Sequence, residues 1–200
     1  MPLSPFDRGI TALAGTFFGP EWLHHGDRFD VLRLAYGAEA DPGAVAATRQ
    51  EALLMLGGLA TTAVQALWQA GTRAWVGIKH APDAGHQWMR EIVAFCDEWS
   101  ARHPGPSSGA EPADDGRELL TSVLALIAEV RIPDREVTDA LADCARNCTP
   151  DLALRWLLQV LSVADHPLLT ASQYDVVTQL AEHLKYGEYV LPDRGVIVAD

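Results

Sequence analysis

The stretch Thr149-Pro150-Asp151-Leu152-Ala153-Leu154-Arg155-Trp156-Leu157-Leu158-Gln159-Val160-Leu161-Ser162 decides the fold of this chain. It opens on a threonine and a proline, the residue types favoured at a helix N-cap and at the first helical position. Beyond the cap, apolar side chains point in almost every direction, and only Arg155, Gln159 and Ser162 leave a narrow polar strip. Because a helix that is apolar nearly all round is normally buried, residues 150–164 are predicted to form the central helix.

Helical periodicity continues on both sides of this segment. Ser4-Pro5 predicts the start of a first helix, and Asp41-Pro42 predicts the start of a long one whose apolar face includes Leu56 and Ala63. Gly57-Gly58 weakens the long helix by about 1 kcal/mol per glycine, which favours a kink or break there. Further helices are expected over 27–36, 84–101, 117–130, 133–147 and from Thr170 or Ser172 to Gly187.

The predicted fold class is therefore mainly α, with antiparallel, bundle-like packing of helices. A small C-terminal hairpin is also expected, because residues 189–191 and 196–198 are apolar and flank a Pro-Asp-Arg-Gly turn. The stretch HPGPSSGAEPADDG, residues 103–116, lacks apolar periodicity and is interpreted as a flexible linker. It divides the chain into an N-terminal helical region, residues 1–102, and a C-terminal helical region, residues 117–200.

Composition narrows the classes of function. The chain has 200 residues and a formal net charge of −12, so its surface repels nucleic acids and anionic membranes and favours a cationic protein partner. No apolar run approaches the ~20 residues of a membrane span, and the N-terminus lacks the pattern of a secretion signal. Three cysteines without a paired framework are typical of reduced thiols. A cytoplasmic protein that binds neither nucleic acid nor membrane is expected.

Motifs of catalysis are missing from the sequence, which contains no phosphate loop, dinucleotide fingerprint, His-Glu-x-x-His or Gly-x-Ser-x-Gly. Three weaker groupings of residues could carry chemistry: His24 and His25 beside Asp27 as metal ligands, Cys144 and Cys148 with His166 or His183 as a zinc site, and Cys96 with His80 or His86 as nucleophile and base. A solvated loop and buried thiols explain these residues more simply. The chain is thus predicted not to be an enzyme, with no catalytic residue, metal or cofactor.

An acidic stripe offers the strongest physical argument for a binding surface. Glu136, Asp139 and Asp143 lie three and four residues apart, so they share one face of the helix predicted over 133–147. Like charges at these spacings destabilise a helix by a few tenths of a kcal/mol each, roughly. A partner carrying arginine or lysine would relieve this repulsion and add charge-assisted hydrogen bonds. The alternative is an ordinary solvated helix face.

Phe17-Phe18-Gly19-Pro20-Glu21-Trp22 resembles the Tyr-Phe-His-Gln-Asp-Trp signature of a family of bacterial immunity proteins from contact-dependent growth inhibition systems. Gly19 and Pro20 depart from the polar pair of that signature. The segments 27–32, 40–51 and 87–92 also resemble the family in their order, so the similarity extends over residues 10–100 at most. Residues 117–200 resemble no family.

The resemblance implies a cytosolic protein that binds and neutralises a cognate toxin domain, often a nuclease with a basic surface. The predicted partner-binding residues combine the stripe with acids and tryptophans of the N-terminal region: Glu136, Asp139, Asp143, Glu21, Trp22, Asp27, Asp30 and Trp75. Two alternatives stay open. The chain could be a helical scaffold or regulatory adaptor for another protein, or an unrecognised, metal-dependent enzyme.

Overall fold

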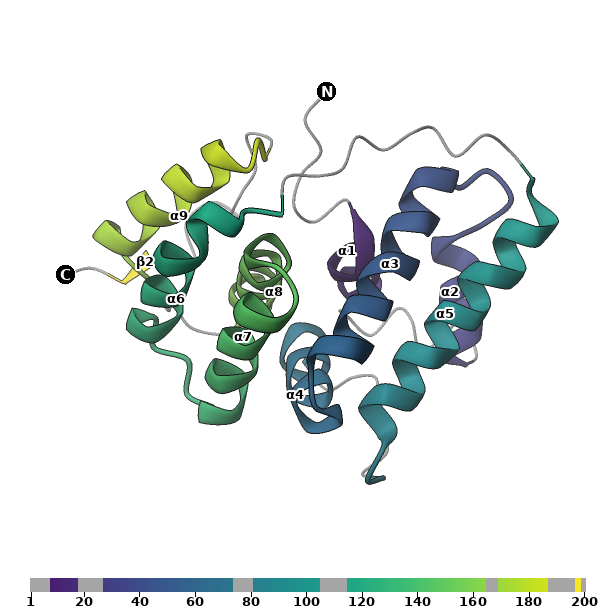
Figure 1. Cartoon of the computed structure of the whole chain (residues 1–200), viewed down its shortest axis with the longest axis horizontal. Helices are drawn as coiled ribbons and strands as arrows, with labels where there is room; N and C mark the ends of the chain where they lie inside the picture. Colours follow the sequence, from purple (N-terminus) through teal and green to yellow (C-terminus); the bar gives the residue numbers. More distant parts are fainter. Residues whose placement is uncertain are drawn as a thin grey trace.

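The computed structural model describes residues 8–17, 27–73, 81–104, 115–164, 169–186 and 197–198, and within them the chain is almost entirely helical, as the periodicity predicted (Figure 1). The N-terminal region contributes α1 (Gly9–Thr16), α2 (Arg28–Ala35), α3 (Pro42–Gly58), α4 (Thr61–Thr72) and α5 (Ala84–Arg102). The C-terminal region contributes a 3-10 turn, η2 (Arg117–Leu119), followed by α6 (Leu120–Glu129), α7 (Arg135–Asn147), α8 (Pro150–Ser162) and α9 (Ala171–His183).

Side-chain caps confirm three of the predicted helix starts. The Asp41 carboxylate accepts hydrogen bonds from the backbone N–H groups of Gly43 and Ala44 at the start of α3. Thr149 Oγ1 accepts from Leu152 N at 3.0 Å, and Thr170 forms a reciprocal capping box with the third residue of α9. Each cap satisfies backbone donors that have no partner inside the helix.

The start of α1 differs from the prediction. Arg8 is extended and the helix begins at Gly9, so Ser4-Pro5, which lies outside the described residues, does not start it. The backbone N–H of Ile10 instead donates to Oε2 of Glu51 on α3 at 2.8 Å. Residue 9 has φ +65°, and a Cβ there would lie 2.1 Å from the same oxygen, so only glycine fits. A carboxylate from another helix therefore fixes where α1 begins.

The long helix predicted after Asp41 is broken into α3 and α4, which confirms a break next to Gly57-Gly58. Leu59 and Ala60 adopt extended backbone between the two helices. The apolar face predicted across the break is largely confirmed, because Val45, Ala52, Leu59 and Leu67 are buried. Leu56 and Ala63 are partly buried and pack against the same core. The change of direction brings α4 against helices of both regions.

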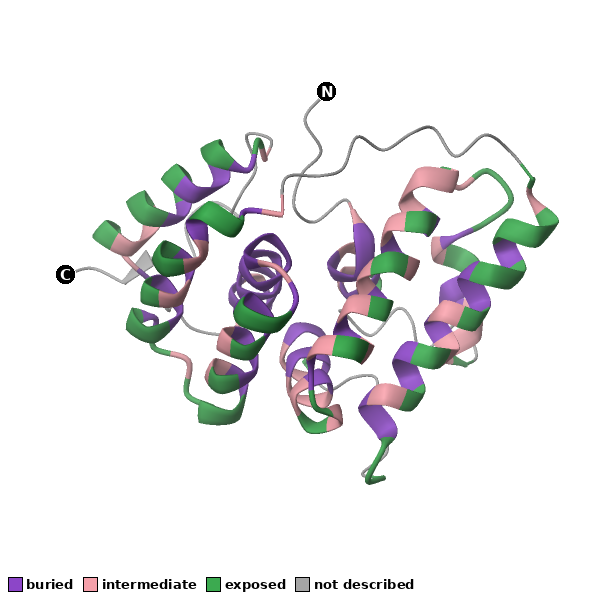
Figure 2. Cartoon of the chain, viewed as in Figure 1, coloured by how far each residue is buried: buried purple, intermediate pink, exposed green. Residues whose placement is uncertain are grey.

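The hydrophobic core is centred on α8, as predicted. Every residue from Pro150 to Leu161 is buried, including the strip residues Arg155 and Gln159 (Figure 2). Buried side chains of both predicted regions belong to one hydrophobic cluster. Helix α4 contacts α1 and α5 on one side and α7 and α8 on the other, so it joins the two regions.

The described strands do not form the predicted hairpin with each other. β1 (Leu169–Thr170) precedes α9 and pairs in parallel with β2 (Ile197–Val198). The other predicted arm, residues 189–191, and most of the predicted linker, residues 105–114, lie outside the described residues. In the described part of the chain, no helix combines the length and apolar character needed to cross a membrane.

Candidate functional site

The predicted acidic stripe lies on the outer face of α7. Glu136, Asp139 and Asp143 are all exposed, while the opposite side of the helix, which includes Val137 and Leu141, is buried against the core. Asp134 caps the helix by accepting a hydrogen bond from Glu136 N at 2.8 Å. Packing on α4 and α8 holds α7 in place, so the three carboxylates are presented at fixed spacing.

Neighbouring arginines pair only loosely with this stripe. Arg135 Nε lies 3.6 Å from an Asp139 oxygen, and Arg146 Nη1 lies 3.6 Å from an Asp143 oxygen. All four side chains are more than half exposed, up to 91% for Arg135. Exposed pairs of this kind contribute about 0–1 kcal/mol and exchange readily. The carboxylates are therefore accessible to a cationic partner.

A groove of about 620 Å³ adjoins the N-terminal end of α7. Its walls are mostly small or branched apolar side chains from α4, from residues 132–137 and from the end of α8. Asp134 and Arg73 mark its polar margins, and Arg73 Nε donates a hydrogen bond to the carbonyl oxygen of Val163. Such a groove has room for an apolar side chain from a partner.

Of the other predicted site residues, the two that the structure describes, Asp27 and Asp30, lie at α2 and not beside the stripe. Asp27 and Asp30 form a capping box at the start of α2, and Asp30 also pairs with Arg33. These oxygens therefore already stabilise the helix. Glu21, Trp22 and Trp75 lie outside the described residues.

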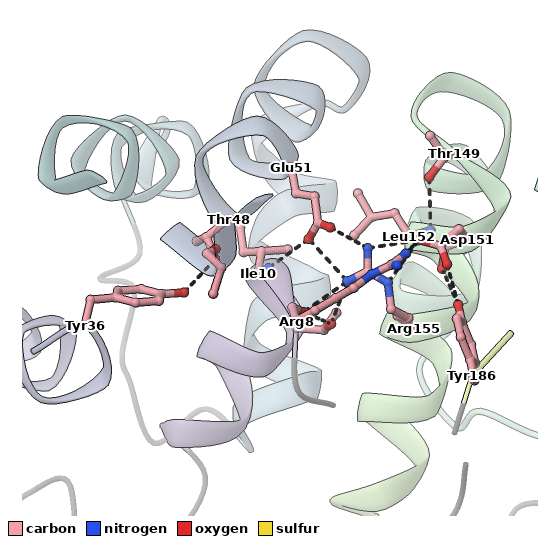
Figure 3. Close-up of polar contacts among 12 residues, drawn as sticks. Arg8, Ile10, Tyr36, Thr48, Glu51, Thr149, Asp151, Leu152, Arg155 and Tyr186 are labelled. Carbon is pink, nitrogen blue, oxygen red and sulfur yellow. Dashed lines mark hydrogen bonds and ion pairs between the residues drawn. The ribbon is translucent and has the colours of Figure 1, made fainter. Parts of the chain in front are cut away.

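A buried ionic network centred on Arg155 of α8 was not predicted from the sequence (Figure 3). The Arg155 side chain is 1% exposed, and its Nη2 lies 2.6 Å from Oε1 of Glu51 on α3 and 3.0 Å from Oδ2 of Asp151. Its Nη1 donates to Thr11 Oγ1 at 3.0 Å and to the carbonyl oxygen of Arg8 at 3.3 Å. One guanidinium thus holds α1, α3 and α8 together.

Asp151 extends this network to Arg8, just before α1, and to Tyr186, just after α9. Arg8 Nη2 lies 2.8 Å from Asp151 Oδ2, and the hydroxyl of Tyr186, just beyond α9, donates to Asp151 Oδ1 at 2.6 Å. Burial by itself would raise the pKa of Asp151, but the nearby charges of Arg155 and Arg8 and the Tyr186 hydrogen bond lower it below its ordinary value. The carboxylate is therefore ionised where it pairs with the two cations.

The lowered pKa of Asp151 predicts a pH-dependent contribution to stability. A carboxylate that titrates lower in the folded than in the unfolded chain stabilises the fold above its unfolded pKa, about 4, and loses this effect as the pH falls through the folded value. The destabilisation caused by Asp151→Asn should therefore be largest near neutral pH and shrink below about pH 4. Urea unfolding of both proteins across pH would measure it.

An exposed carboxylate provides the control for this experiment. Asp175→Asn on α9 neutralises an exposed carboxylate and should change the free energy of unfolding by less than about 0.5 kcal/mol at neutral pH. If Asp151→Asn lowers the free energy of unfolding by the same amount from pH 7 to pH 2, the lowered pKa of Asp151 is contradicted.

The described residues contain no cluster of three or more metal-ligating side chains. His24, His25, His80 and His166 lie outside them. His183 is exposed on α9, and His86 Nε2 lies 2.8 Å from the carbonyl oxygen of Leu59. Burial raises the pKa of Cys96 to about 12, so that thiol is a poor nucleophile.

Cys144 and Cys148 are both free and buried, as predicted for apolar positions of α7.

Comparisons of the chain with protein-family models, with curated proteins and with solved structures return no match.

Proposed function

We propose that this chain is a non-enzymatic immunity protein that binds a cognate toxin domain with a basic surface in the cytosol and covers its active surface. The observation that carries the proposal is the exposed, rigidly held stripe of Glu136, Asp139 and Asp143 on α7. The net charge of −12 and the resemblance of residues 10–100 to immunity proteins support the same role.

The electrostatics of α7 suit a partner that itself binds phosphates. A nuclease domain needs a cationic surface to hold a nucleic-acid backbone. Carboxylates at fixed spacing attract such a surface and raise the rate of encounter, because long-range attraction steers the two molecules together. Since Asp139 and Asp143 are only loosely paired at 3.6 Å, replacing Arg135 and Arg146 with arginines of the partner costs little.

The groove next to α7 supplies the second element of an interface. Tight complexes bury a few apolar anchors inside a polar rim, and most of the binding energy comes from those anchors. Val137 lines the groove and is followed along the same helix by the acids Asp139 and Asp143. An apolar side chain of the toxin would enter the groove while its basic residues contact the stripe.

The direct test is protection by the chain against the toxin domain encoded by the neighbouring gene. Cells producing that domain should survive only when they also produce this chain, and the two purified proteins should elute together as a complex. An absence of both complex and protection with the neighbouring toxin would refute the proposal. Recovery of a different cellular protein from an unbiased pull-down would support the adaptor alternative instead.

Charge reversal on α7 is expected to slow association without unfolding the chain. The triple variant Glu136→Lys/Asp139→Lys/Asp143→Lys should lower the association rate constant by about tenfold or more at low salt, because steering depends on local charge. The difference should shrink as salt is added. Stopped-flow or surface-plasmon measurements at several salt concentrations would check this.

A charge-matched control separates the stripe from the overall net charge. Glu39→Lys/Asp175→Lys/Glu182→Lys reverses three exposed acids located away from α7 and alters the net charge by the same amount. If both triple variants slow association equally, α7 has no special role. Circular dichroism would verify that each variant keeps its helix content.

A further inference from the structure

Helix α3 turns an uncharged face to the solvent (Figure 2). Its exposed residues follow one another at spacings of four, three and four, so they lie on one side of the helix: Ala46, Gln50, Leu53 and Gly57. Leu53, a large apolar side chain, is 42% exposed. These four residues are called the α3 face below.

The two charged residues within α3 are already paired inside the chain. Arg49 pairs with Asp97 on α5, and Glu51 is turned inward to Arg155. The exposed positions of α5, α7 and α9, by contrast, each include charged residues. Because the chain has a net charge of −12, two copies of it repel each other at most surfaces. The α3 face is a surface where this repulsion is small.

Gly57 has no packing role among the described residues. A Cβ added there would meet no described atom within 4 Å, whereas a Cβ at Gly58 would lie 2.8 Å from the carbonyl oxygen of Asn147. Glycine in a helix is less favourable than alanine, and its advantage is that another backbone can approach closely. Contacts within the chain therefore account for Gly58, and a close approach from outside the chain accounts for Gly57.

The α3 face has the same pattern in both directions along the helix. A small residue stands at each end, Ala46 and Gly57, and the longer side chains of Gln50 and Leu53 lie between them. A two-fold contact between identical copies pairs each residue with its symmetry mate, so it needs a pattern of this kind. We propose that two copies of this chain associate through antiparallel α3 helices, with Ala46 opposite Gly57 and Gln50 opposite Leu53 of the other copy.

The size of the α3 face limits the strength of this dimer. Small residues at both ends let the two helix axes approach to about 8 Å, the short end of the usual range, and Leu53 of each copy then leaves water. One helix face is smaller than the ~800 Å² per partner of a standard interface. The dissociation constant is therefore expected to exceed about 1 μM, the weak end for standard interfaces.

Salt separates this contact from the binding of a basic partner. Added salt screens the repulsion between two acidic copies, so the dimer should become tighter as the salt concentration rises. A complex held by attraction between the acidic stripe and a basic toxin should become weaker under the same conditions. The two associations can therefore be tested, and can fail, independently of each other.

Sedimentation equilibrium of the full-length chain, from micromolar to millimolar concentration, is the direct test. Leu53→Glu should raise the dissociation constant at least about tenfold, because it brings like charges together in the contact. Leu34→Glu is the matched control, since it adds the same charge at a 62% exposed position of α2 and should change nothing. A chain that stays monomeric at millimolar concentration in high salt would overturn the proposal, as would equal effects of the two variants.

Gly57→Leu distinguishes a lost contact from a damaged fold. Its side chain begins in space that no described atom occupies, and leucine favours helix more than glycine, so the midpoint of thermal unfolding should not fall. Dimerisation should nevertheless weaken, because the backbones can no longer approach at residue 57. If this variant dimerises as tightly as the wild type, the α3 face is not the contact.

Cross-linking tests the antiparallel register. A mixture of Ala46→Cys and Gly57→Cys chains should form a disulfide between copies under mild oxidation, because these positions face each other. Ala46→Cys alone should not, because the two copies of residue 46 would lie about 16 Å apart along the helices. Equal cross-linking in both samples would contradict the proposed pairing.

Discussion

Replacing Arg155 with methionine is expected to reduce the free energy of unfolding by about 3–5 kcal/mol, because removing one partner of a buried ion pair leaves uncompensated charge in the core. Methionine fills most of the volume of the arginine side chain. The loss of stability should therefore come mainly from charge and hydrogen bonding, and only to a small extent from a cavity. Glu51 and Asp151 would each lose the guanidinium that now lies within 3.0 Å of their oxygens. Urea unfolding followed by circular dichroism would measure the loss.

Two further variants make this result specific. Arg135→Met removes a 91% exposed arginine whose ion pair spans 3.6 Å, and it should change stability by less than about 0.5 kcal/mol. Adding Glu51→Gln and Asp151→Asn to Arg155→Met removes the two carboxylate charges that had paired with Arg155 and should recover part of the loss, while the partly exposed Arg8 loses its partner Asp151. If Arg155→Met costs no more than Arg135→Met, the network does not stabilise the fold.

Trp68→Ala should have an effect of similar size, about 3–5 kcal/mol, because it empties the centre of an aromatic cluster. Trp68 is fully buried, and its ring contacts Trp88 at 5.4 Å, Phe17 at 5.6 Å and Trp156 at 6.1 Å between centroids. These rings come from α4, α5, α8 and the end of α1, so the cavity would open between both regions. Chemical denaturation would quantify the loss.

Trp68→Phe provides an informative comparison. The indole N–H of Trp68 is buried and has no hydrogen-bond partner among the described residues, and phenylalanine removes that donor together with part of the ring. Trp68→Phe should therefore lower the free energy of unfolding much less than Trp68→Ala does. Leu34→Ala, at a side chain that is 62% exposed, should be nearly neutral. Equal losses for Trp68→Ala and Trp68→Phe would mean that ring packing is not the source of the stability.

The sequence predicted helices best where the signal was local. Two helix starts, Asp41-Pro42 and Thr149-Pro150, depend on a cap that bonds to backbone groups only a few residues away. The glycine pair before the break between α3 and α4 also acts locally. These features could therefore be recognised in the sequence. The start of α1 could not be predicted in this way, because the backbone N–H of Ile10 donates to Glu51, which lies 41 residues away along the chain. A donor and acceptor that meet only after folding leave no pattern along the chain.

Arg155 shows the same limit in the core. Its polarity placed it on the narrow polar strip of α8, with no partner predicted, and in the structure Arg8, Thr11, Glu51 and Asp151 satisfy it in the interior. The pair Asp151 and Arg155, four residues apart, was the one local hint. The spacing of Asp151 and Arg155 is equally typical of a surface ion pair, because the sequence does not reveal that Glu51 of α3 packs against them.

The acidic stripe of the candidate binding surface could be predicted from the sequence, but the groove beside it could not. Helix geometry alone puts Glu136, Asp139 and Asp143 on one face, and the structure places all three on the exposed side of α7. The adjoining groove could not be predicted, because its walls come from three separate segments of the chain. The toxin-binding role of the surface stays a prediction.

The position of α4 has a consequence for how such a gene could diversify. Since this helix touches α1 and α5 as well as α7 and α8, its side chains must match partners encoded on both sides of residues 103–116. Recombination at that point would join halves whose contacts had never been selected together. Variation in this lineage is therefore expected to accumulate by substitution on exposed faces such as that of α7, with the crossover of whole halves selected against.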